Sequence, residues 1–572
     1  MSAQLLIRVL PTHVASALIA LCFSASSAAH SPELVLAGGA LRLCSSLSPT
    51  QCADDQVPAG RGNASYSLSS KQRKHALRET KPLLDSRTHR KLKGELSRAR
   101  QALGTQPVTA RALSDALWQA CRGGRCSWRR MDDDQRAALL AALELGQFDE
   151  SGKRVPERVS LDASRDPSGP AILRHFVSRA ALRSKTDRPR IAVVTASGFD
   201  PFDAVDFYLG ALAQAGAEPL WWPIDAALAS VVFSAADCSQ LDALHSNLLG
   251  LPSRSRVIPD RVSQQKAWCE SEQAGSLPNN IQGVFFAGGD QWKLRRAFFD
   301  AQDRPNPWLM ELRKRHAAGE LVVAGTSAGT AVQSGPGMLS NGSPQMALRD
   351  GPKPAVPPTP GCGRSNNCQG LVEDAFTVWP AGGLGLAGPF LMDTHFAERA
   401  REWRLMRALA EGPATTGLGV DETSAIHMTQ HPDQSWTLAA LGRSGGWLFD
   451  TESARCGAWK GRASYLAAGS AVRWRGGEIQ AEKAAAIDSP QPPYADEIAS
   501  SEDSDGSFGE AAIRLALDPL VSGARRWAWR AEGATLSLQR SETTEHTLAP
   551  PRPPSVLRLN AELSFAADCE SK

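Results

Sequence analysis

Short runs of consecutive apolar residues, each followed by glycine within a few positions, recur along the chain and predict buried strands. The first run is Glu33–Ala37 (ELVLA), and the next of this kind is 190–196 (RIAVVTA). Such runs are typical of strands covered on both faces. Beyond residue 190, strands are expected to alternate with helices, at 203–215 (helix), 218–223 (strand), 283–287 (strand), 292–299 (helix), 320–324 (strand), 327–333 (helix) and 390–393 (strand). We therefore expect an α/β fold with a mostly parallel sheet, and a site at the carboxyl ends of its strands.

The segment between the first two strands has a different pattern. Residues 71–100 carry 11 Lys or Arg against 3 acids, and residues 107–147 place apolar side chains at helical spacing. We expect a helical insertion over 54–185 inside the α/β domain. The basic run fits either a solvated helix face or a surface that grips an acidic polymer.

Composition suggests further boundaries in the second half of the chain. Residues 351–370 form a Pro- and Gly-rich loop, and residues 484–510 are rich in Pro, Ser and acids, as in a linker. The expected division is signal peptide 1–29, first catalytic strand 30–53, helical insertion 54–185, catalytic α/β domain 186–480, linker 481–510 and C-terminal extension 511–572.

Overall composition indicates a globular protein. The 572 residues are 42% hydrophobic and 22% charged, with a net charge of +3. The length allows about two to four domains. Near-neutral charge argues against a surface built throughout for nucleic acid. The body of the chain contains no run of about 18 apolar residues, which argues against a membrane-spanning enzyme.

The first 29 residues predict a secretory signal. Arg8 supplies a positive charge, 14–23 is an apolar run, and 27–29 offers small residues for cleavage. An N-terminal core helix is the alternative, and a lipid anchor at Cys22 is less favoured because a large residue precedes it. We expect an exported protein, periplasmic or extracellular.

The cysteines fit that compartment. There are 11, so loss of Cys22 with the signal leaves an even number, as expected for disulfides. A zinc site is the alternative, but the cysteines lack C-x₂-C spacing. Sequence neighbours suggest the pairs Cys44–Cys52, Cys121–Cys126 and Cys362–Cys368, and leave Cys238, Cys269, Cys456 and Cys569 for longer links.

The strongest chemical motif is Gly325-Thr326-Ser327-Ala328-Gly329, a G-x-S-x-G between an apolar strand and a helix. Such a turn lifts the serine hydroxyl above the sheet as a nucleophile. The Ala328 amide, at the start of the helix, points to where an oxyanion would form. The alternative is an ordinary glycine-rich connection.

A nucleophilic serine needs a base and an acid that orients the base. His395 follows an apolar strand, and Glu422 follows another short apolar segment. His427 lies inside a strand-like stretch and is expected to be structural. The order Ser, His, Glu argues against an α/β-hydrolase, in which the acid precedes the histidine.

A second glycine-rich turn, Gly288-Gly289-Asp290-Gln291, follows the strand at 283–287. Its glycines allow backbone amides to approach a ligand, so Gly289 or Asp290 could supply a second oxyanion donor. Gln291 could bind a substrate amide or carboxylate. A plain turn explains the motif equally well.

Three arginines follow the candidate base. Arg399, Arg401 and Arg404 could hold a carboxylate, and the last two share a helical face. Surface arginines balanced by neighbouring glutamates are the alternative. Asp393 is a candidate partner for a substrate guanidinium or for the arginines themselves.

Together these motifs resemble those of the cyanophycinases, in a serine-peptidase family that also contains aspartyl dipeptidase. The matching segments are LVLAGGA at 34–40, IAVVTASG at 191–198, FFAGGDQ at 285–291, GTSAGTAV at 325–332, GLGL…DTHFAERAREWRL at 383–405 and GLGVDETSAI at 417–426. The resemblance implies a glutamine-amidotransferase-like (flavodoxin-like) three-layer α/β sandwich. It also implies a Ser–His–Glu triad, which falls on Ser327, His395 and Glu422.

The resemblance implies hydrolysis of cyanophycin, a poly-aspartate with arginine on β-amide links, to β-Asp-Arg dipeptides. The family motif usually reads Asp-Gln-His-Phe, and here Thr394 replaces the glutamine, which shortens a substrate contact. The insertion and the tail after residue 480 are foreign to the family pattern. A peptidase for other Asp-containing peptides and a non-catalytic binding protein remain alternatives.

The expected partner is a polypeptide substrate, with neither nucleic acid nor membrane, and a homodimer is left open. No metal or organic cofactor is expected.

Overall fold

A computed structural model of the chain describes residues 30–54, 56–121, 126–234, 236–482, 526–531, 534–540 and 556–565. The expected signal peptide at 1–29 and most of the expected linker lie outside these residues.

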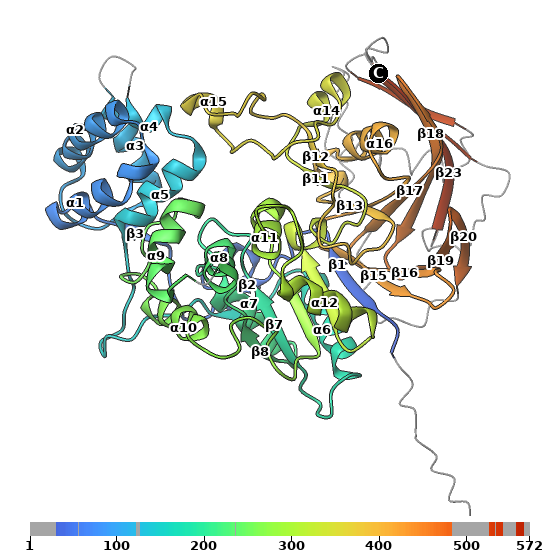
Figure 1. Cartoon of the computed structure of the whole chain (residues 1–572), viewed down its shortest axis with the longest axis horizontal. Coiled ribbons are helices and arrows are strands. Elements are labelled where there is room, and N and C mark those ends of the chain that lie inside the picture. Colours follow the sequence, from blue (N-terminus) through green and yellow to red (C-terminus); the bar gives the residue numbers. More distant parts are fainter. Residues whose placement is uncertain are drawn as a thin grey trace, which may run out of the picture.

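The main sheet has nine strands in the order β20-β19-β16-β15-β1-β10-β9-β7-β8 (Figure 1). One half is parallel and consists of β1 (Glu33–Ala37), β10 (Val322–Thr326), β9 (Gly283–Phe286), β7 (Arg190–Val194) and β8 (Glu218–Trp221). The other half is antiparallel and consists of β15 (Ser424–Gln430), β16 (Trp436–Gly442), β19 (Ala471–Arg475) and β20 (Glu478–Glu482). The α/β class is therefore confirmed. The expectation of a mostly parallel sheet holds only for the first half. In the other half, short turns join β15 to β16 and β19 to β20, and the chain runs from β16 to β19 through two strands of the second sheet rather than through a crossover helix.

Helices cover both faces of the parallel half. One face packs against α6 (Ser168–Ala181) and α7 (Val205–Gln214). The other face packs against α8 (Ala226–Ser234), α11 (Gln291–Phe298), α12 (Pro307–Ala317) and α13 (Ala328–Ala331). The helices and strands expected beyond residue 190 are confirmed to within a few residues.

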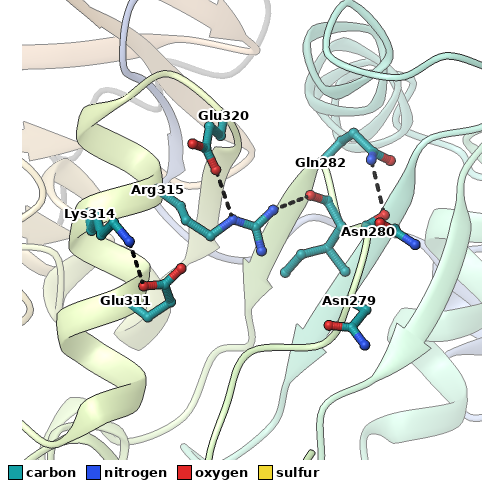
Figure 2. Close-up of a pocket in the computed structure, with 8 residues that line it drawn as sticks. Asn279, Asn280, Gln282, Glu311, Lys314, Arg315 and Glu320 are labelled. Carbon is teal, nitrogen blue, oxygen red and sulfur yellow. Dashed lines mark hydrogen bonds and ion pairs between the residues drawn. The ribbon is translucent and has the colours of Figure 1, made fainter.

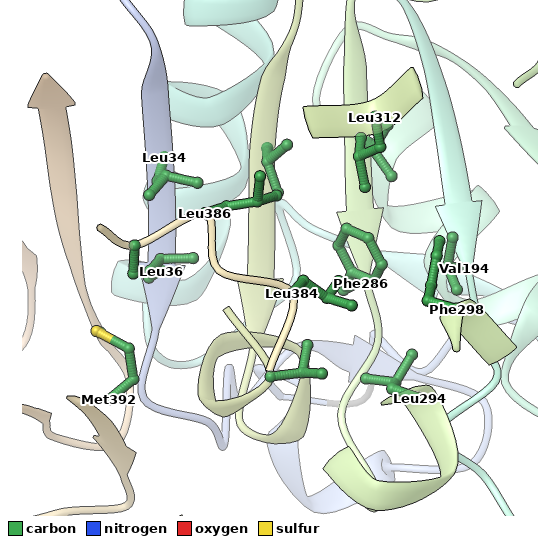
Figure 3. Packing of buried hydrophobic residues seen from close by; sticks show 14 of the residues in the cluster. Leu34, Leu36, Val194, Phe286, Leu294, Phe298, Leu312, Leu384, Leu386 and Met392 are labelled. Atoms are coloured by element: carbon green, nitrogen blue, oxygen red, sulfur yellow. The ribbon is translucent and has the colours of Figure 1, made fainter. Parts of the chain in front are cut away.

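Strand β1 shows why its sequence is apolar from Leu34 to Ala37. Leu34 and Leu36 point into one core, and Val35 and Ala37 point into the other. Figure 3 shows Leu34 and Leu36 packed together with side chains from neighbouring strands and helices. A strand between two helix layers has no polar face, so period-two alternation disappears.

A second sheet of seven strands is mostly antiparallel and lies at the opposite end of the molecule from α1 and α2 (Figure 1). Its order is β13 (Phe390–Thr394), β14 (Thr416–Val420), β17 (Gly445–Arg455), β18 (Ala458–Ala467), β23 (Val556–Ser564), β22 (Ala534–Arg540) and β21 (Arg526–Ala531). Helix α16 (Glu402–Glu411) packs on it. Strands from the expected C-terminal extension thus belong to the same sheet as β13 and β14, with Leu559 and Leu563 of β23 in its core.

The segment between β1 and β7 has an apolar core of its own, which includes Leu92, Leu96, Leu113, Leu117 and Leu139. The helices around this core are α1 (Ser70–Glu79), α2 (Ser86–Leu103), α3 (Ala110–Gln119), α4 (Ser127–Arg130) and α5 (Asp133–Leu143). Polar contacts join it to the main body, among them an ion pair of 2.6 Å between Arg254 and Glu144.

Short elements complete the described part of the chain. The strands are β2 (Cys44–Ser45), β3 (Ser65–Tyr66), β4 (Val108–Thr109), β5 (Glu144–Leu145), β6 (Val159–Ser160), β11 (Met338–Ser340) and β12 (Thr377–Trp379). The helices are η1 (Pro49–Gln51), η2 (Lys81–Leu83), η3 (Cys238–Gln240), α9 (Leu241–Leu244), η4 (His245–Leu249), α10 (Pro259–Cys269), α14 (Pro344–Asp350), α15 (Cys362–Ser365) and η5 (Ala397–Arg399). Within the described ranges, every helix is too short or too polar to cross a membrane.

The structure confirms the disulfides expected between sequence neighbours. These are Cys44–Cys52, Cys121–Cys126 and Cys362–Cys368. A longer link joins Cys238 to Cys269, and Cys456 is also disulfide-bonded. Cys569 lies outside the described residues.

We expect thiol titration of the denatured, unreduced chain without residues 1–29 to detect almost no free thiol. The reason is that the four described disulfides already occupy eight cysteines. The same sample after reduction serves as the control. A count of eight or more before reduction would contradict both the pairing and an oxidising compartment.

Candidate active site

Ser327 occupies the sharp turn between β10 and α13, where its backbone takes φ 52° and ψ −115°. Two glycines permit this turn. A Cβ on Gly325 would lie 2.2 Å from the carbonyl oxygen of Gly329, and one on Gly329 would lie 2.1 Å from that of Phe286. The strand–turn–helix context that the G-x-S-x-G motif requires is therefore present.

A continuous hydrogen-bond chain runs from this serine through a histidine to a glutamate. Ser327 Oγ lies 2.7 Å from His395 Nε2, and His395 Nδ1 lies 2.6 Å from Glu422 Oε1. Ser327 follows β10 of the nine-stranded sheet, whereas His395 follows β13 and Glu422 follows β14 of the seven-stranded sheet. The site is thus assembled where the two sheets meet.

The glycine pair after β1 holds these turns together. The Gly39 backbone lies against the His395 ring, so that a Cβ there would be 2.3 Å from Cε1 of the ring. The carbonyl of Gly38 accepts the His395 amide at 2.8 Å, and that of Gly39 accepts the Thr423 amide at 2.9 Å. From the sequence, these glycines were expected only to end a buried strand. Their position at the carboxyl end of a buried strand was the available signal for a role in the site.

Two carboxylates also join the histidine loop to the glutamate turn. Glu398 Oε2 accepts the Glu422 amide at 3.0 Å, and Asp421 Oδ1 accepts the Ala397 amide at 3.0 Å. These hydrogen bonds fix the backbone on either side of the His395–Glu422 contact. Glu398 is one of the glutamates beside the three arginines, and its sequence position alone indicates no more than a counter-ion.

The surroundings of His395 favour its neutral form. Its side chain is nearly buried, with 8% of the residue exposed. Burial lowers the pKa of His395 to about 4, Arg399 and Arg401 add to this shift, and the hydrogen bond that His395 donates to Glu422 opposes it. At neutral pH the imidazole can therefore accept a proton from Ser327.

Backbone amides near Ser327 could stabilise an oxyanion. Ala328 is the first residue of α13, so its amide has no acceptor within the helix. A Cβ on Gly288 would lie 3.5 Å from Ser327 Cβ, which brings the second glycine turn beside the nucleophile. Within the described part of the chain, no acceptor faces the Gly289 amide.

The Asp290 amide is not available for this role. It donates to the Ser197 carbonyl at 2.9 Å, and the Asp290 side chain caps α11 by accepting the Trp292 amide at 2.7 Å. Of the two amides considered from the sequence, only that of Gly289 is left for an oxyanion.

Some of the expected substrate-binding residues bind each other, and others lie near the site with backbone partners or with an exposed side chain. Arg404 grips the buried Asp393 carboxylate with two hydrogen bonds of 2.5 and 2.7 Å, so both charges are used within the protein. Arg401 donates to the Thr394 carbonyl at 2.7 Å, and Gln291 donates to the Leu339 carbonyl at 2.6 Å. Arg399 is exposed beside the site.

Two other polar regions lie away from Ser327. His427 lies 3.3 Å from Glu33 and 3.2 Å from His175 at the opposite end of β1, consistent with a structural role. Figure 2 shows a pocket of about 490 Å³, lined by residues 279–282, Glu311, Lys314, Arg315 and Glu320. It lies at the amino ends of β9 and β10 and so belongs to the other edge of the sheet.

No protein-family model matches the chain. Among curated proteins, it is 33% identical to a cyanophycinase of Trichormus variabilis over 159 residues, which cover 28% of this chain and 43% of the relative. A cyanophycinase of Synechococcus elongatus is 29% identical over 185 residues, covering 32% and 47%. A third, of Geminocystis herdmanii, is 33% identical over 139 residues, covering 24% and 40%.

The matches thus span less than half of each relative's length. Among solved structures, a peptidase from an acI-B1 Actinobacterium aligns with a TM-score of 0.31 and 13% identity, over 54% of this chain and 92% of that one. That likeness is too weak to support an argument. On the sequence matches, part of the chain is homologous to the cyanophycinases, and these matches support a relation to cyanophycinase-like peptidases.

Proposed function

We propose that the protein is an exported serine peptidase that hydrolyses aspartate-containing polypeptides of the cyanophycin type. The hydrogen-bond chain from Ser327 through His395 to Glu422 carries this proposal, because it matches the connectivity of a nucleophile, a base and an orienting acid. The four disulfides support export, and the cyanophycinase homologues support the substrate class.

The proposed reaction begins with attack of Ser327 Oγ on the scissile carbonyl while His395 Nε2 takes the hydroxyl proton. The amides of Ala328 and Gly289 stabilise the negative oxygen of the tetrahedral intermediate. His395 then gives the proton to the leaving amine, which departs as the acyl-enzyme forms. A water molecule, activated by the same imidazole, releases the acid product and restores the serine.

Glu422 acts through His395 in this scheme. Its carboxylate accepts a hydrogen bond from Nδ1–H, so that the proton stays on Nδ1 and the unprotonated Nε2 faces the serine. It also stabilises the imidazolium that forms after proton transfer.

For cyanophycin itself, the expected product is the β-Asp-Arg dipeptide. Gln291, Arg399 and Arg401 are the proposed carboxylate holders, whereas Asp393 and Arg404 act by fixing the backbone beside them. We also propose that the nine-stranded sheet with its two helix layers is the glutamine-amidotransferase-like core.

A peptidase for other aspartate-containing peptides is the second candidate. Thr394, which stands where the family usually has glutamine, favours it, because a threonine side chain reaches less far towards a substrate. A binding protein without catalytic activity would not need the hydrogen-bonded serine, histidine and glutamate together.

Replacement of the nucleophile tests the proposal directly. Ser327→Ala should lower the rate of cyanophycin hydrolysis by about 10⁴-fold or more, since the covalent step is lost. Ser276→Ala, at an exposed serine, is the matched control and should keep the parent rate. Circular dichroism checks the fold of both variants. A Ser327→Ala rate within about tenfold of the parent would eliminate the serine mechanism.

The pH profile tests the roles of His395 and Glu422. Because the base must be neutral, kcat/KM should stay level from neutral pH downwards and fall as the pH drops through about 4. Glu422→Gln should reduce kcat less than Ser327→Ala does. It should also move the acidic fall to lower pH, because the bond that opposes the lowered pKa of His395 is weakened. An acidic fall near pH 6.5 in the parent would refute the assigned environment of the histidine.

Substitution at position 394 separates the two substrate candidates. Thr394→Gln should raise kcat/KM for cyanophycin relative to simple aspartyl peptides, because the longer amide restores the contact of the family motif. The control is Thr186→Gln, which makes the same substitution at an exposed position. The threonine near the site, Thr423, is not used as a control because its hydroxyl donates to the Ala40 carbonyl. An unchanged ratio would show that position 394 does not set specificity.

A further inference from the structure

Helices α1 and α2 carry a strongly cationic surface that the proposed chemistry does not use. We define the cationic face as eight side chains of α1, α2 and the short helix η2 between them: Lys71, Lys74, Lys81, Arg87, Arg90, Lys91, Lys93 and Arg100. All are exposed except Lys91 and Arg100, which are half-buried. On α2, the buried side is taken by residues such as Leu92, Leu96 and Ala99, so the basic side chains occupy the solvent side.

The acids of the same helices do not neutralise this face. Glu79 pairs with Arg78 at 2.9 Å, and Asp85 accepts the amide of Arg87 at 2.8 Å as the cap of α2. Glu95 is buried, where it accepts the Ser127 amide at 2.9 Å. Within the described ranges, none of the eight cations forms a salt bridge with an acidic side chain. A solvated helix face usually interleaves both signs, and this one does not.

Three basic side chains of this region already have partners within the protein and are excluded from the face, the first being Arg78, which pairs with Glu79. Arg73 donates to Ser97 Oγ at 2.8 Å, which ties α1 to α2. Arg98 donates to the Ala120 carbonyl at 3.0 Å. The remaining eight charged side chains therefore form no ion pair within the described part of this helical region, which has a packed apolar core of its own.

Polar contacts attach the helical region that contains α1 to α5 to the elements around the candidate site. Lys293 of α11 binds Asp134 of α5 at 3.1 Å, and α11 begins at Gln291 beside the nucleophile turn. The Asp133 amide donates to the Pro360 carbonyl at 2.9 Å, in the loop closed by Cys362–Cys368. Figure 1 shows α1 and α2 at the end of the molecule beyond α5, to one side of α11. A polypeptide bound at Ser327 would therefore have to extend past α5 to contact them.

We propose that the cationic face binds a carboxylate-rich polypeptide, namely an aspartate polymer with more free carboxylates than arginines. This inference rests on the proposed function for its polypeptide substrate. The 18 residues of α2 extend for about 27 Å, the length of about eight extended peptide units. Several carboxylates of one chain can therefore meet several cations at once. Fully arginylated cyanophycin carries as many guanidinium groups as carboxylates and gains little from the same charges.

The surface chemistry favours this occupant over a lipid bilayer. Helices that lie on membranes expose large apolar side chains, and α1 and α2 expose none among their described residues. The nearby exposed Trp118 of α3 is stacked under Arg129 at 3.8 Å. A nucleic acid would offer phosphates to the same cations, so duplex DNA is an arm of the test.

The test measures binding of fluorescent poly-L-aspartate to the full chain with Ser327→Ala, which requires no catalysis. The variant Arg87→Glu, Arg90→Glu, Lys93→Glu reverses three charges of the face. Its matched control, Lys266→Glu, Arg304→Glu, Lys314→Glu, makes the same change in net charge at exposed positions elsewhere. We expect the first variant to weaken binding by about tenfold or more at low salt, and the control by less than about twofold. Added salt should weaken binding of the parent.

Three results would overturn the inference. These are equal weakening in the two variants, parent binding that is insensitive to salt, and tighter binding of duplex DNA or anionic phosphatidylglycerol vesicles than of poly-L-aspartate at equal charge concentration. Circular dichroism establishes that both variants are folded. If they are not, the single change Lys93→Glu against Lys314→Glu repeats the comparison.

In the active chain, the face variant should raise KM for the aspartate polymer and leave kcat/KM for an aspartyl dipeptide unchanged. An equal loss on both substrates would contradict a role in polymer binding. Failure of the proposed hydrolysis would leave the binding result intact, so the two hypotheses can fail separately.

Discussion

The backbone of Gly39 approaches the His395 ring so closely that no side chain fits between them. This contact places the end of β1, the central strand of the nine-stranded sheet, directly against a residue supplied by the seven-stranded sheet. The nucleophile belongs to the first sheet, and the base and acid belong to the second. Their geometry therefore depends on how tightly the two sheets meet. Hydrogen bonds from His395 to Gly38 and from Thr423 to Gly39 fix that meeting at the backbone level.

Much of this arrangement could be predicted from local sequence. Strand β1 and the turn at Ser327 are short segments whose apolar run and glycine spacing leave few alternatives. The three side chains of the hydrogen-bond chain each follow an apolar strand, which was a sufficient signal to select them. Local patterns identified β13 and the segment of β14 but did not indicate that they belong to a second sheet, because pairing between β18 and β23 joins segments separated by a long stretch of sequence.

The partners of charged and polar groups were only partly predictable from the sequence. Asp393 was a candidate partner for a substrate guanidinium or for the arginines, and the structure shows the second arrangement, in which Asp393 and Arg404 are 1% and 2% exposed and bind each other. A buried carboxylate is stable only with such a partner, and spacing alone does not reveal which arginine provides it. The Asp290 amide likewise donates its hydrogen bond to the carbonyl of Ser197, which follows a different strand, and is therefore not available to a substrate. Motifs identified which groups were near the site, whereas packing decided which of them remained available.

The position of β23 between β18 and β22 has a consequence for truncated chains. Its apolar side chains, including Leu559 and Leu563, complete the core of the seven-stranded sheet. Without β23, the long strand β18 would present unsatisfied backbone donors and acceptors along an open edge. Such edges recruit strands from other molecules and promote aggregation. Proteolytic loss of this last strand would thus turn a completed sheet into a self-associating one, even though every residue near Ser327 is retained.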